Sequence, residues 1–268
     1  MDALHEKARR LRAELLRLGS TAVAFSGGVD SAYLLHMAHE TLGDRAIAVT
    51  VRASAFPRRE TAEAEDFCAR RGIRQVWVDL DVLEIPGFAE NPPDRCYLCK
   101  RQLFRRIQAV AAEQGMAAVS EGSNLDDEGD YRPGMRAIAE LGVASPLRTA
   151  GLTKTDIRAL SREAGLPTWA KPSLACLASR FVYGEAITRE GLERVDRSEQ
   201  LLAELGFTQA RVRVHGTVAR IELLPEEFPR LLEPENRTRV VQTLRGLGFT
   251  YVALDLQGYR TGSMNETL

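Results

Sequence analysis

The sequence predicts an α/β protein with a doubly wound parallel sheet, followed by a smaller C-terminal α+β domain. Apolar runs of strand length alternate with helical patterns through the first two thirds of the 268 residues. This alternation is typical of right-handed βαβ units, in which helices cover both faces of a parallel sheet. Beyond residue 184 the pattern changes to alternating strands between helices, so we expect domains at 1–184 and 185–268.

Periodicity and turn residues define the elements of the first domain. Apolar residues at helical spacing predict a helix over 1–18. The next expected elements are a strand at 23–25, a helix through Leu34 and Ala38, a strand at 45–51, a helix at 57–72 and a strand at 74–79. A helix that follows Cys99 and runs to about Gln114 comes next, and then a strand at 117–120. Residues 145–147 predict a short fifth strand. Thr153 and Asp156 predict a capping box that starts a helix ending near Gly165.

The second domain is expected to open with a helix over 188–205. Strands at 211–214 and 219–223, two helical patterns and a closing strand at 251–256 follow it. Prolines interrupt residues 167–180 and predict an irregular segment ahead of this domain.

Charge and hydropathy exclude several classes of protein. Thirty-six basic and 37 acidic residues give a net charge of −1, which disfavours tight, nonspecific binding of nucleic acid. No apolar run approaches the roughly 20 residues that span a bilayer. The N-terminal segment carries both signs of charge and lacks the apolar core of a signal peptide. We therefore expect a cytoplasmic protein without a membrane partner.

A glycine-rich turn after the first strand is the strongest functional signal. The run Ser26-Gly27-Gly28-Val29-Asp30-Ser31 follows the apolar strand and opens a helix. Free backbone N–H groups and the helix dipole bind phosphate at such a turn, and glycine lets the phosphates come close. The Ser26 and Ser31 hydroxyls can donate hydrogen bonds, and Asp30 can hold Mg2+. The spacing fits neither the Walker pattern nor Gly-x-Gly-x-x-Gly, and an ordinary strand–turn–helix corner is the alternative.

A second polar segment follows the strand expected at 117–120. It runs from Glu121 to Asp127 and includes Gly122 and Asn124. Doubly wound folds bind ligands where loops leave the carboxyl ends of parallel strands, so this loop is a candidate for ligand binding. A solvated acidic loop is the alternative.

The four cysteines predict metal-binding or reactive groups rather than disulfides, because the protein is expected in the cytoplasm. Cys68 lies among apolar residues of an expected helix and predicts a buried core thiol. Cys96 and Cys99 are three residues apart near a helix start, so both sulfurs can reach one metal. With Cys176 as a third ligand they suit a [4Fe–4S] cluster with one open iron. A redox-active dithiol and a zinc site, for which His215 is a weak fourth ligand, remain alternatives.

Cys176 also carries a signal of its own. Ser179 and Arg180 follow it closely, and a cationic neighbour favours the thiolate, which is the nucleophilic form. Cys176 is therefore the candidate nucleophile, and a buried structural thiol is the alternative.

Taken together, these residues resemble one family of ATP pyrophosphatases along almost the whole chain. The turn at 26–31 resembles the PP-loop, which identifies the superfamily and its adenine nucleotide α-hydrolase-like fold. Further features are Gly122 to Asn124, Asp126, Asp127, Asp130 through Gly134, Pro172 through Arg180, Tyr183 with Gly184, the strand at 211–213 and the tail at 258–265. They resemble the ATP-dependent sulfur transferases, sacrificial in some members, that build the nickel-pincer nucleotide of lactate racemase. The segment that contains Cys176 and the tail make the resemblance specific.

This resemblance implies a reaction in three steps. ATP and Mg2+ adenylate a carboxylate of a pyridinium-3,5-dicarboxylate mononucleotide and release pyrophosphate. A sulfur nucleophile then displaces AMP, and a C–S bond breaks so that a thiocarboxylate leaves. The implied nucleotide-binding residues are Ser26, Gly27, Gly28, Asp30, Ser31, Gly122 and Asn124, and the implied catalytic residues are Cys176, Asp30 and Arg180.

The cysteines bear on the source of the sulfur. In the family that this chain resembles, some members have only the counterpart of Cys176. That cysteine gives up its sulfur and becomes dehydroalanine. The additional Cys96 and Cys99 resemble members in which three cysteines hold a [4Fe–4S] cluster, whose open iron can carry sulfide. The resemblance favours the cluster and leaves the sacrificial route as the alternative.

The phosphate of such a substrate needs cationic groups. Arg211 and Arg213 alternate on one strand and project from one face, where guanidinium groups suit phosphate. Ser179 is a further substrate-binding candidate, and Arg180 can steady the carboxylate or AMP. For the arginines, solvated surface residues are the alternative. The resemblance also implies a homo-oligomer, and a tRNA thiolase, an ammonia-using synthetase and a nonenzymatic ATP-binding redox sensor remain open.

Overall fold

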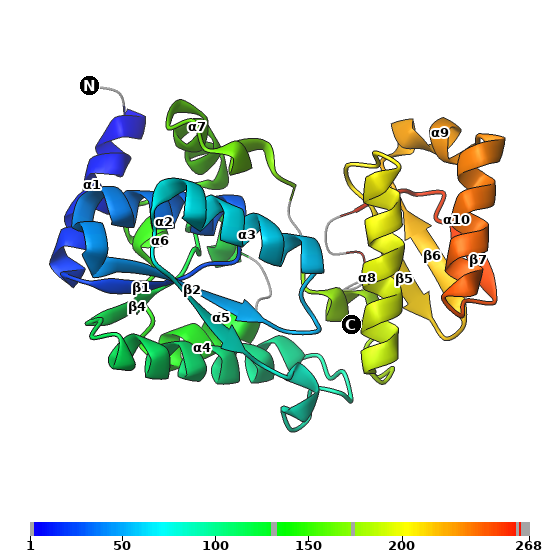
Figure 1. Cartoon of the computed structure of the whole chain (residues 1–268), viewed down its shortest axis with the longest axis horizontal. Coiled ribbons are helices and arrows are strands. Elements are labelled where there is room, and N and C mark those ends of the chain that lie inside the picture. Colours follow the sequence, from blue (N-terminus) through cyan, green and yellow to red (C-terminus); the bar gives the residue numbers. More distant parts are fainter. Residues whose placement is uncertain (1–2, 130–132, 173–174, 261–262, 264–268) are drawn as a thin grey trace. The chain divides into compact units, whose positions relative to one another are not determined.

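The computed structural model describes residues 3–129, 133–172, 175–260 and 263 (Figure 1). The chain forms two compact units. The larger unit contains residues 1–53, 59–80 and 96–173, and the smaller unit contains 54–58, 81–95 and 174–268. The chain therefore enters the smaller unit twice before its final segment.

A parallel sheet forms the centre of the larger unit. Its strands in the described residues are β1 (Thr21–Ala24), β2 (Ala46–Arg52), β3 (Gln75–Asp79) and β4 (Ala118–Ser120), in the order β3–β2–β1–β4. Because β2 and β4 lie on opposite sides of β1, the order of the strands reverses at β1. Open α/β sheets bind ligands at the carboxyl ends of strands at this point. The α/β class predicted from the sequence is confirmed.

Helices cover both faces of this sheet, with α1, α2 and α3 on one side and α4 and α5 on the other (Figure 1). The helices of this part of the chain are α1 (Ala3–Leu18), α2 (Val29–Leu42), α3 (Arg58–Arg71), α4 (Arg95–Glu113), α5 (Pro133–Glu140), α6 (Pro146–Thr149) and α7 (Lys154–Glu163). The capping box predicted for α7 is confirmed: the Thr153 hydroxyl accepts from the Asp156 N–H at 3.2 Å, and the Asp156 carboxylate accepts from the Thr153 N–H at 3.0 Å.

Neighbouring residues of β1 belong to different hydrophobic cores. Val23 belongs to the core that includes Leu11 of α1 and Leu34 of α2. Ala22 belongs to the core that includes Ile107 of α4. All five side chains are 0% exposed. Because successive strand residues point to opposite faces, a shift of one residue in the register would exchange the two cores.

The strand predicted at 145–147 is wrong. Ser145 is the N-cap residue of α6, and Pro146 is the first residue of that helix. Proline has no N–H for a sheet ladder, whereas its fixed φ suits the first turn of a helix. Pairing with β4 is limited to a single parallel bridge between Ser120 and Ala144.

The smaller unit is an α+β structure with a three-stranded sheet. In the described residues the sheet contains β5 (Arg211–His215), β6 (Val218–Glu222) and β7 (Tyr251–Leu254). β5 and β6 are antiparallel, whereas β6 and β7 are parallel. The helices α8 (Arg189–Glu204) and α10 (Pro234–Gly246) lie along this sheet, and α9 (Phe228–Leu232) precedes α10 (Figure 1).

Residues 81–95 and 174–184 also belong to the smaller unit, whereas the sequence predicts a boundary after residue 184. The Asn91 side chain is 0% exposed, and its amide donates to the carbonyl of Val182 at 2.7 Å. The Asn91 carbonyl accepts from the Gly184 N–H at 3.0 Å. Phe181 then forms a parallel bridge to Val214 of β5. These long-range contacts explain why residues 181–184 pack with Asn91 and with β5 of the smaller unit.

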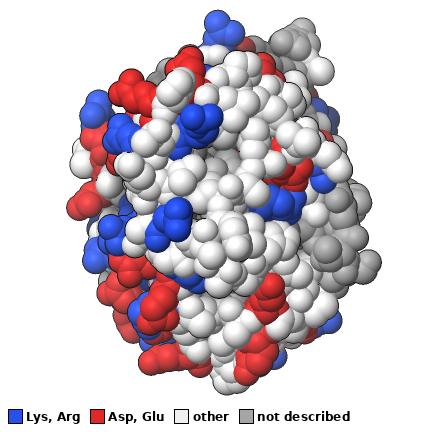
Figure 2. All heavy atoms as spheres, turned by 90° about the vertical axis from the view of Figure 1, so that its right-hand side faces the viewer, with Lys and Arg blue, Asp and Glu red and all other residues white. Residues whose placement is uncertain are grey.

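Charges of both signs are mixed on the face shown in Figure 2. Among the described residues on this face, lysine and arginine side chains lie among aspartate and glutamate side chains. The mixture agrees with the near-zero net charge of the chain. No helix in the described part of the chain is long and apolar enough to cross a membrane.

Two leucines of α1 provide a matched test of the core. Leu11 is 0% exposed and Leu16 is 56% exposed. We expect Leu11→Ala to lower the free energy of unfolding by about 2–5 kcal/mol, because it leaves a cavity against the sheet. We expect Leu16→Ala to change it by less than about 0.5 kcal/mol. Urea unfolding followed by circular dichroism measures both, and equal effects would contradict the packing of α1.

Candidate active site

The glycine-rich turn joins β1 to α2 and is braced by its own hydroxyl groups. Gly27 has a φ of +76°, a conformation that favours glycine. The Ser31 hydroxyl accepts from the Ser26 N–H at 3.3 Å and donates to the carbonyl of Gly28 at 3.1 Å. The hydroxyls of Ser26 and Ser31 are 3.1 Å apart. The turn therefore has a defined shape at the positive end of the α2 dipole, which suits phosphate.

The loop after β4 approaches this turn without a side chain between them. A Cβ atom at Gly122 would lie 3.0 Å from the backbone nitrogen of Ser31 and 3.3 Å from the carbonyl carbon of Asp30. The strands β1 and β4 are parallel neighbours, so their carboxyl ends meet at this edge of the sheet. The structure thus brings together the two segments that the sequence selected separately.

The carboxylate of Asp30 contacts two further elements. It forms an ion pair with Lys154, the first residue of α7, and accepts a long hydrogen bond of 3.5 Å from the Asn124 amide. The side chains of Asp30 and Lys154 are 23% and 33% exposed, so a ligand can reach both. A reachable carboxylate beside a phosphate-binding turn fits Mg2+, which prefers oxygen ligands. Sequence reasoning missed Lys154 because only the packing of α7 brings it to the turn.

Lys171 is a second lysine that the sequence analysis did not select. It follows the short 3₁₀ helix η4 (Pro167–Ala170) and is 12% exposed. Its ammonium donates to the carbonyl of Gly27 at 3.0 Å and pairs with Glu63 of α3 at 2.6 Å. Through Lys171, the segment that follows η4 therefore connects the glycine-rich turn to α3.

A buried carboxylate orders the loop after β4. Glu121 is 7% exposed and accepts from the N–H and the hydroxyl of Ser123 at 3.0 and 2.7 Å. It also accepts from the hydroxyl of Ser145 at 2.5 Å. Three donors satisfy this carboxylate and connect the loop to the start of α6.

The acidic residues of this loop cap backbone groups. Asp127 accepts from the N–H of Asn124 at 2.9 Å, and Asp126 accepts from the N–H of Lys154 at 2.8 Å. Asp126 is exposed and Asp127 is half-buried, so these carboxylates order the backbone while they remain in contact with solvent, and ligand binding by this loop stays a prediction. Asp130, like residues 261–262 and 264–265 of the tail, lies outside the described residues.

The paired cysteines lie near the start of α4, in the larger unit. Cys96 is exposed and Cys99 is 8% exposed. Residues three apart lie on one side of a helix, so the two thiols suit a soft metal or a dithiol. Within the described residues, no three Cys, His, Asp or Glu side chains form a group that could hold a metal ion. Cys176 belongs to the smaller unit, and its role as a third ligand stays a prediction.

The buried position predicted for Cys68 is confirmed. Its side chain lies on α3 in the core between helices and sheet, and it is 1% exposed. Burial raises the pKa of this thiol to about 12, so it stays protonated and unreactive at neutral pH.

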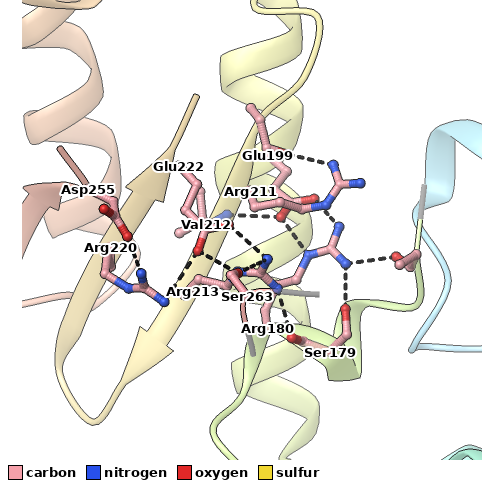
Figure 3. Close-up of polar contacts among 12 residues, drawn as sticks. Ser179, Arg180, Glu199, Arg211, Val212, Arg213, Arg220, Glu222, Asp255 and Ser263 are labelled. Carbon is pink, nitrogen blue, oxygen red and sulfur yellow. Dashed lines mark hydrogen bonds and ion pairs between the residues drawn. The ribbon is translucent and has the colours of Figure 1, made fainter. Parts of the chain in front are cut away.

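A buried ion pair holds Arg180 in the smaller unit (Figure 3). Arg180 ends the 3₁₀ helix η5 (Leu177–Arg180) and is 0% exposed, and its guanidinium donates two hydrogen bonds of 2.8 Å to Glu199 of α8. Burial opposes the charge of Arg180, but attraction to Glu199 outweighs it and raises the pKa of Arg180. Burial likewise opposes the charge of Glu199, and Arg180 lowers the pKa of that carboxyl. Both groups are therefore charged at neutral pH.

The remaining donors of Arg180 fix the backbone around Cys176. Its Nη1 donates to the carbonyls of Ala175 and Cys176 at 2.9 and 3.1 Å and to the hydroxyl of Ser179 at 2.8 Å. The Cys176 carbonyl also accepts from the Ser179 N–H at 2.9 Å. These contacts show that Arg180 positions the backbone, whereas the catalytic contact to the carboxylate or AMP expected from the sequence stays a prediction.

Arg213 of β5 lies in a second buried network (Figure 3). It is 5% exposed and donates to Glu222 of β6 at 2.8 Å, to the carbonyl of Ser179 at 3.0 Å and to the hydroxyl of Ser263 at 3.0 Å. Ser263 in turn donates to Glu222 at 3.0 Å. Arg213 thus connects β5 and β6 to the segment that contains Cys176.

Arg211 lies two residues earlier on the same strand and is 3% exposed. Its guanidinium lies over the ring of Tyr259, 5.2 Å from the ring centroid, and donates to the carbonyl of Ala210 at 2.8 Å. Burial and repulsion by Arg180 lower the pKa of Arg211, which nevertheless remains protonated at neutral pH. The alternative of solvated surface arginines is wrong for Arg211 and Arg213, whereas phosphate binding by them stays a prediction.

Comparison with known proteins identifies the family. No protein-family model matches the chain. It is 40% identical over 269 residues to the pyridinium-3,5-bisthiocarboxylic acid mononucleotide synthase of Lactiplantibacillus plantarum, and the match covers 100% of this chain and 97% of that enzyme. The chain belongs to this synthase family. An uncharacterised protein of Synechocystis is also 40% identical, over 265 residues and 99% of both chains.

The synthase family belongs to a larger superfamily, as a more distant relative shows. The chain is 25% identical over 205 residues to one of the subunits of the glutamine-hydrolysing GMP synthase of Archaeoglobus fulgidus, and this match covers 71% of the chain and 66% of the relative. The protein is therefore a synthase-type enzyme of the PP-loop ATP pyrophosphatase superfamily, as the motif at residues 26–31 predicted.

The exposure of the thiols predicts an order of chemical modification. In the metal-free protein at pH 8 we expect Cys96 to be alkylated first and Cys68 last, because Cys68 is buried and its pKa is about 12. Peptide mass spectrometry after timed iodoacetamide treatment measures the order. Protein unfolded in urea, in which all four thiols should react alike, is the control. Early labelling of Cys68 in the folded protein would contradict the core described for α3.

The contact at Gly122 predicts a defect in nucleotide binding. In Gly122→Ala the added methyl group meets backbone atoms of Asp30 and Ser31, which cannot rotate away as a side chain could. Overpacking of this kind is relieved when the loop moves away from the turn, which separates two segments of the candidate nucleotide site, so we expect ATP with Mg2+ to bind about tenfold more weakly in calorimetry. Gly246→Ala on α10, where a Cβ meets nothing within 4 Å, is the control. Unchanged binding in Gly122→Ala would place the nucleotide elsewhere.

Proposed function

We propose that this protein converts the carboxylates of a pyridinium-3,5-dicarboxylate mononucleotide into thiocarboxylates and uses ATP to activate each carboxylate. The full-length similarity to the Lactiplantibacillus plantarum synthase carries this proposal. The phosphate-binding turn at the switch point of the sheet supports the use of ATP. Because the relative's name specifies a bisthiocarboxylic acid, two sulfur atoms must enter each molecule.

The first step proposed is adenylation of a substrate carboxylate at the turn between β1 and α2. The carboxylate oxygen attacks the α-phosphorus of ATP, and the bond to pyrophosphate breaks. The turn residues Ser26 to Ser31 and the loop residues Gly122 and Asn124 are proposed to bind the phosphates. Asp30 is proposed to hold Mg2+, which neutralises charge on the departing pyrophosphate. The acyl adenylate then has AMP as a leaving group, which a free carboxylate lacks.

The phosphate of the mononucleotide is proposed to bind at Arg211 and Arg213, with Ser179 nearby. Both guanidinium groups are charged, and guanidinium suits phosphate geometry. Because both arginines are buried, a phosphate can bind them only if it replaces some of their present hydrogen-bond partners. At Arg213 these partners include the Ser179 carbonyl and the Ser263 hydroxyl.

Sulfur transfer is proposed to occur at Cys176. In the sacrificial route the Cys176 thiolate attacks the acyl carbon and the C–O bond to AMP breaks. Loss of the α-proton of Cys176 then breaks its Cβ–S bond, so that the thiocarboxylate leaves and dehydroalanine remains. Arg180 keeps the backbone of Cys176 in place for either route.

We favour the alternative in which Cys96, Cys99 and Cys176 hold a [4Fe–4S] cluster. Such a cluster, when bound, supplies an open iron that can carry a sulfide and leaves Cys176 intact. The support is the donor chemistry of the two thiols near the start of α4 and the presence of a third thiol at residue 176.

We further propose that the protein is cytoplasmic and forms a homo-oligomer. Apolar side chains at the outer strand of the smaller sheet support self-association: Tyr251 on β7 is 67% exposed, and Leu256, which follows β7, is 84% exposed. Exposed apolar groups near a strand edge favour contact with another chain.

Anaerobic turnover tests the function and the sulfur source together. Protein reconstituted with iron and sulfide is mixed with ATP, Mg2+ and the pyridinium dicarboxylate mononucleotide, and AMP, thiocarboxylate and the mass of the intact chain are measured. We expect AMP in step with thiocarboxylate and an unchanged protein mass. Cys176→Ala should stop sulfur transfer, and Cys68→Ala is the matched control that should not.

Two outcomes would contradict parts of this scheme. Failure of AMP to form with wild-type protein would overturn the proposed function. A loss of about 34 Da at Cys176, the mass of hydrogen sulfide, would overturn the cluster route and establish the sacrificial one.

A further inference from the structure

Lys154 pairs with the carboxylate that is proposed to hold magnesium. We propose that Lys154 is a nucleotide-binding residue that exchanges partners: it neutralises Asp30 in the nucleotide-free protein and moves to the phosphates of ATP when Mg2+ takes its place. This inference rests on the proposed use of ATP and adds a residue and an order of events to it.

The first argument is the placement of Lys154 in the fold. It is the first residue of α7, directly after the capping residue Thr153. Its backbone N–H donates to Asp126 of the loop after β4 at 2.8 Å, which ties the start of α7 to the nucleotide site. The backbone of Lys154 is therefore fixed, whereas its side chain is 33% exposed and ends on a flexible four-carbon stem. Such a side chain can change partners without movement of the helix.

The second argument is charge. Asp30, Asp126 and Asp127 place three carboxylates on neighbouring segments of this site, and ATP brings further negative charge. Mg2+ and an ammonium group on the same carboxylate repel each other, so entry of Mg2+ at Asp30 displaces Lys154. The phosphates that arrive with Mg2+ are then the nearest new anions, and a charge-assisted hydrogen bond to them replaces the lost ion pair.

Lys171 shows by contrast why Lys154 is the residue that exchanges. Lys171 is 12% exposed, and it contacts the Gly27 carbonyl together with Glu63 and Glu60 of α3. Release of Lys171 would leave these partners without their shared cation. Among the described residues, the Lys154 ammonium pairs with one carboxylate, that of Asp30, and this carboxylate gains Mg2+ in exchange.

The exchange predicts opposite changes in two binding constants when the ammonium is removed. In Lys154→Met, Asp30 no longer has to release a cation, so we expect nucleotide-free protein to bind Mn2+, the probe for Mg2+, about fivefold more tightly. The same variant lacks the contact to phosphate, so we expect ATP with Mg2+ to bind about tenfold more weakly. Mn2+ titration followed by electron paramagnetic resonance and calorimetry with ATP and Mg2+ measure these constants.

Two further variants make the result specific. Lys154→Arg keeps the positive charge and should restore most of the affinity for ATP with Mg2+. Lys7→Met is the matched control: Lys7 pairs with Asp156 on the first turn of the same helix at 2.6 Å, with side chains 30% and 20% exposed. It removes a comparable ion pair away from Asp30 and should change neither constant.

A parallel loss of both affinities in Lys154→Met would show a merely structural role and overturn the proposal, as would two unchanged constants. Opposite changes together with rescue by Lys154→Arg would support it. Neither measurement includes the pyridinium nucleotide. If wild-type protein bound ATP with Mg2+ yet formed no thiocarboxylate, the proposed function would fail and the inference about Lys154 would stand on its own binding data.

Discussion

The candidate site depends on the close backbone approach between the loop after β4 and the turn after β1. Parallel pairing of these strands, with Thr21 opposite Ala118 and Val23 opposite Ser120, sets the approach. The absence of a side chain at Gly122 allows it, because a Cβ there would lie 3.0 Å from a backbone nitrogen. The glycine-rich turn and the loop that carries Asn124 consequently lie against each other. The register of the two strands and the glycine at residue 122 together determine the geometry of the candidate site.

In the smaller unit, a buried ion pair between Arg180 and Glu199 fixes part of the backbone. Transfer of a guanidinium and a carboxylate from water is costly, and a buried ion pair often contributes little net stability compared with apolar packing. The pair between Arg180 and Glu199 is therefore better understood as a device for position. It uses a fixed, fully charged group to hold the carbonyls of Ala175 and Cys176, beside the thiol proposed as the nucleophile. A neutral residue could fill the space but could not donate to these carbonyls and to Glu199 together.

The sequence was sufficient for those parts of the site that local chemistry determines. Two glycines in a turn between an apolar run and a helix, and a polar loop after a later strand, indicate phosphate binding without any knowledge of packing. Pro146 could have excluded the strand at 145–147, because its missing N–H is a local property. Lys154, Lys171 and Asn91 could not be found in this way. Each acts on a partner more than 80 residues away, and no periodicity indicates which lysine among many will reach the turn.

The chain around Cys96 and around Cys176 is held by contacts that do not require a metal. Arg95, directly before Cys96, is 4% exposed, donates to Asn91 at 2.9 Å and lies over the ring of Tyr183. Tyr97, directly after Cys96, donates to Glu140 of α5 at 2.7 Å. Arg180 performs the same task for Cys176. Hydrogen bonds and stacking of neighbouring residues therefore hold the chain on both sides of Cys96 and the backbone carbonyl of Cys176. The backbone around Cys176 is therefore held in place for either proposed source of sulfur. The chemistry of the sulfur, rather than the fold, then decides between the cluster route and the sacrificial route.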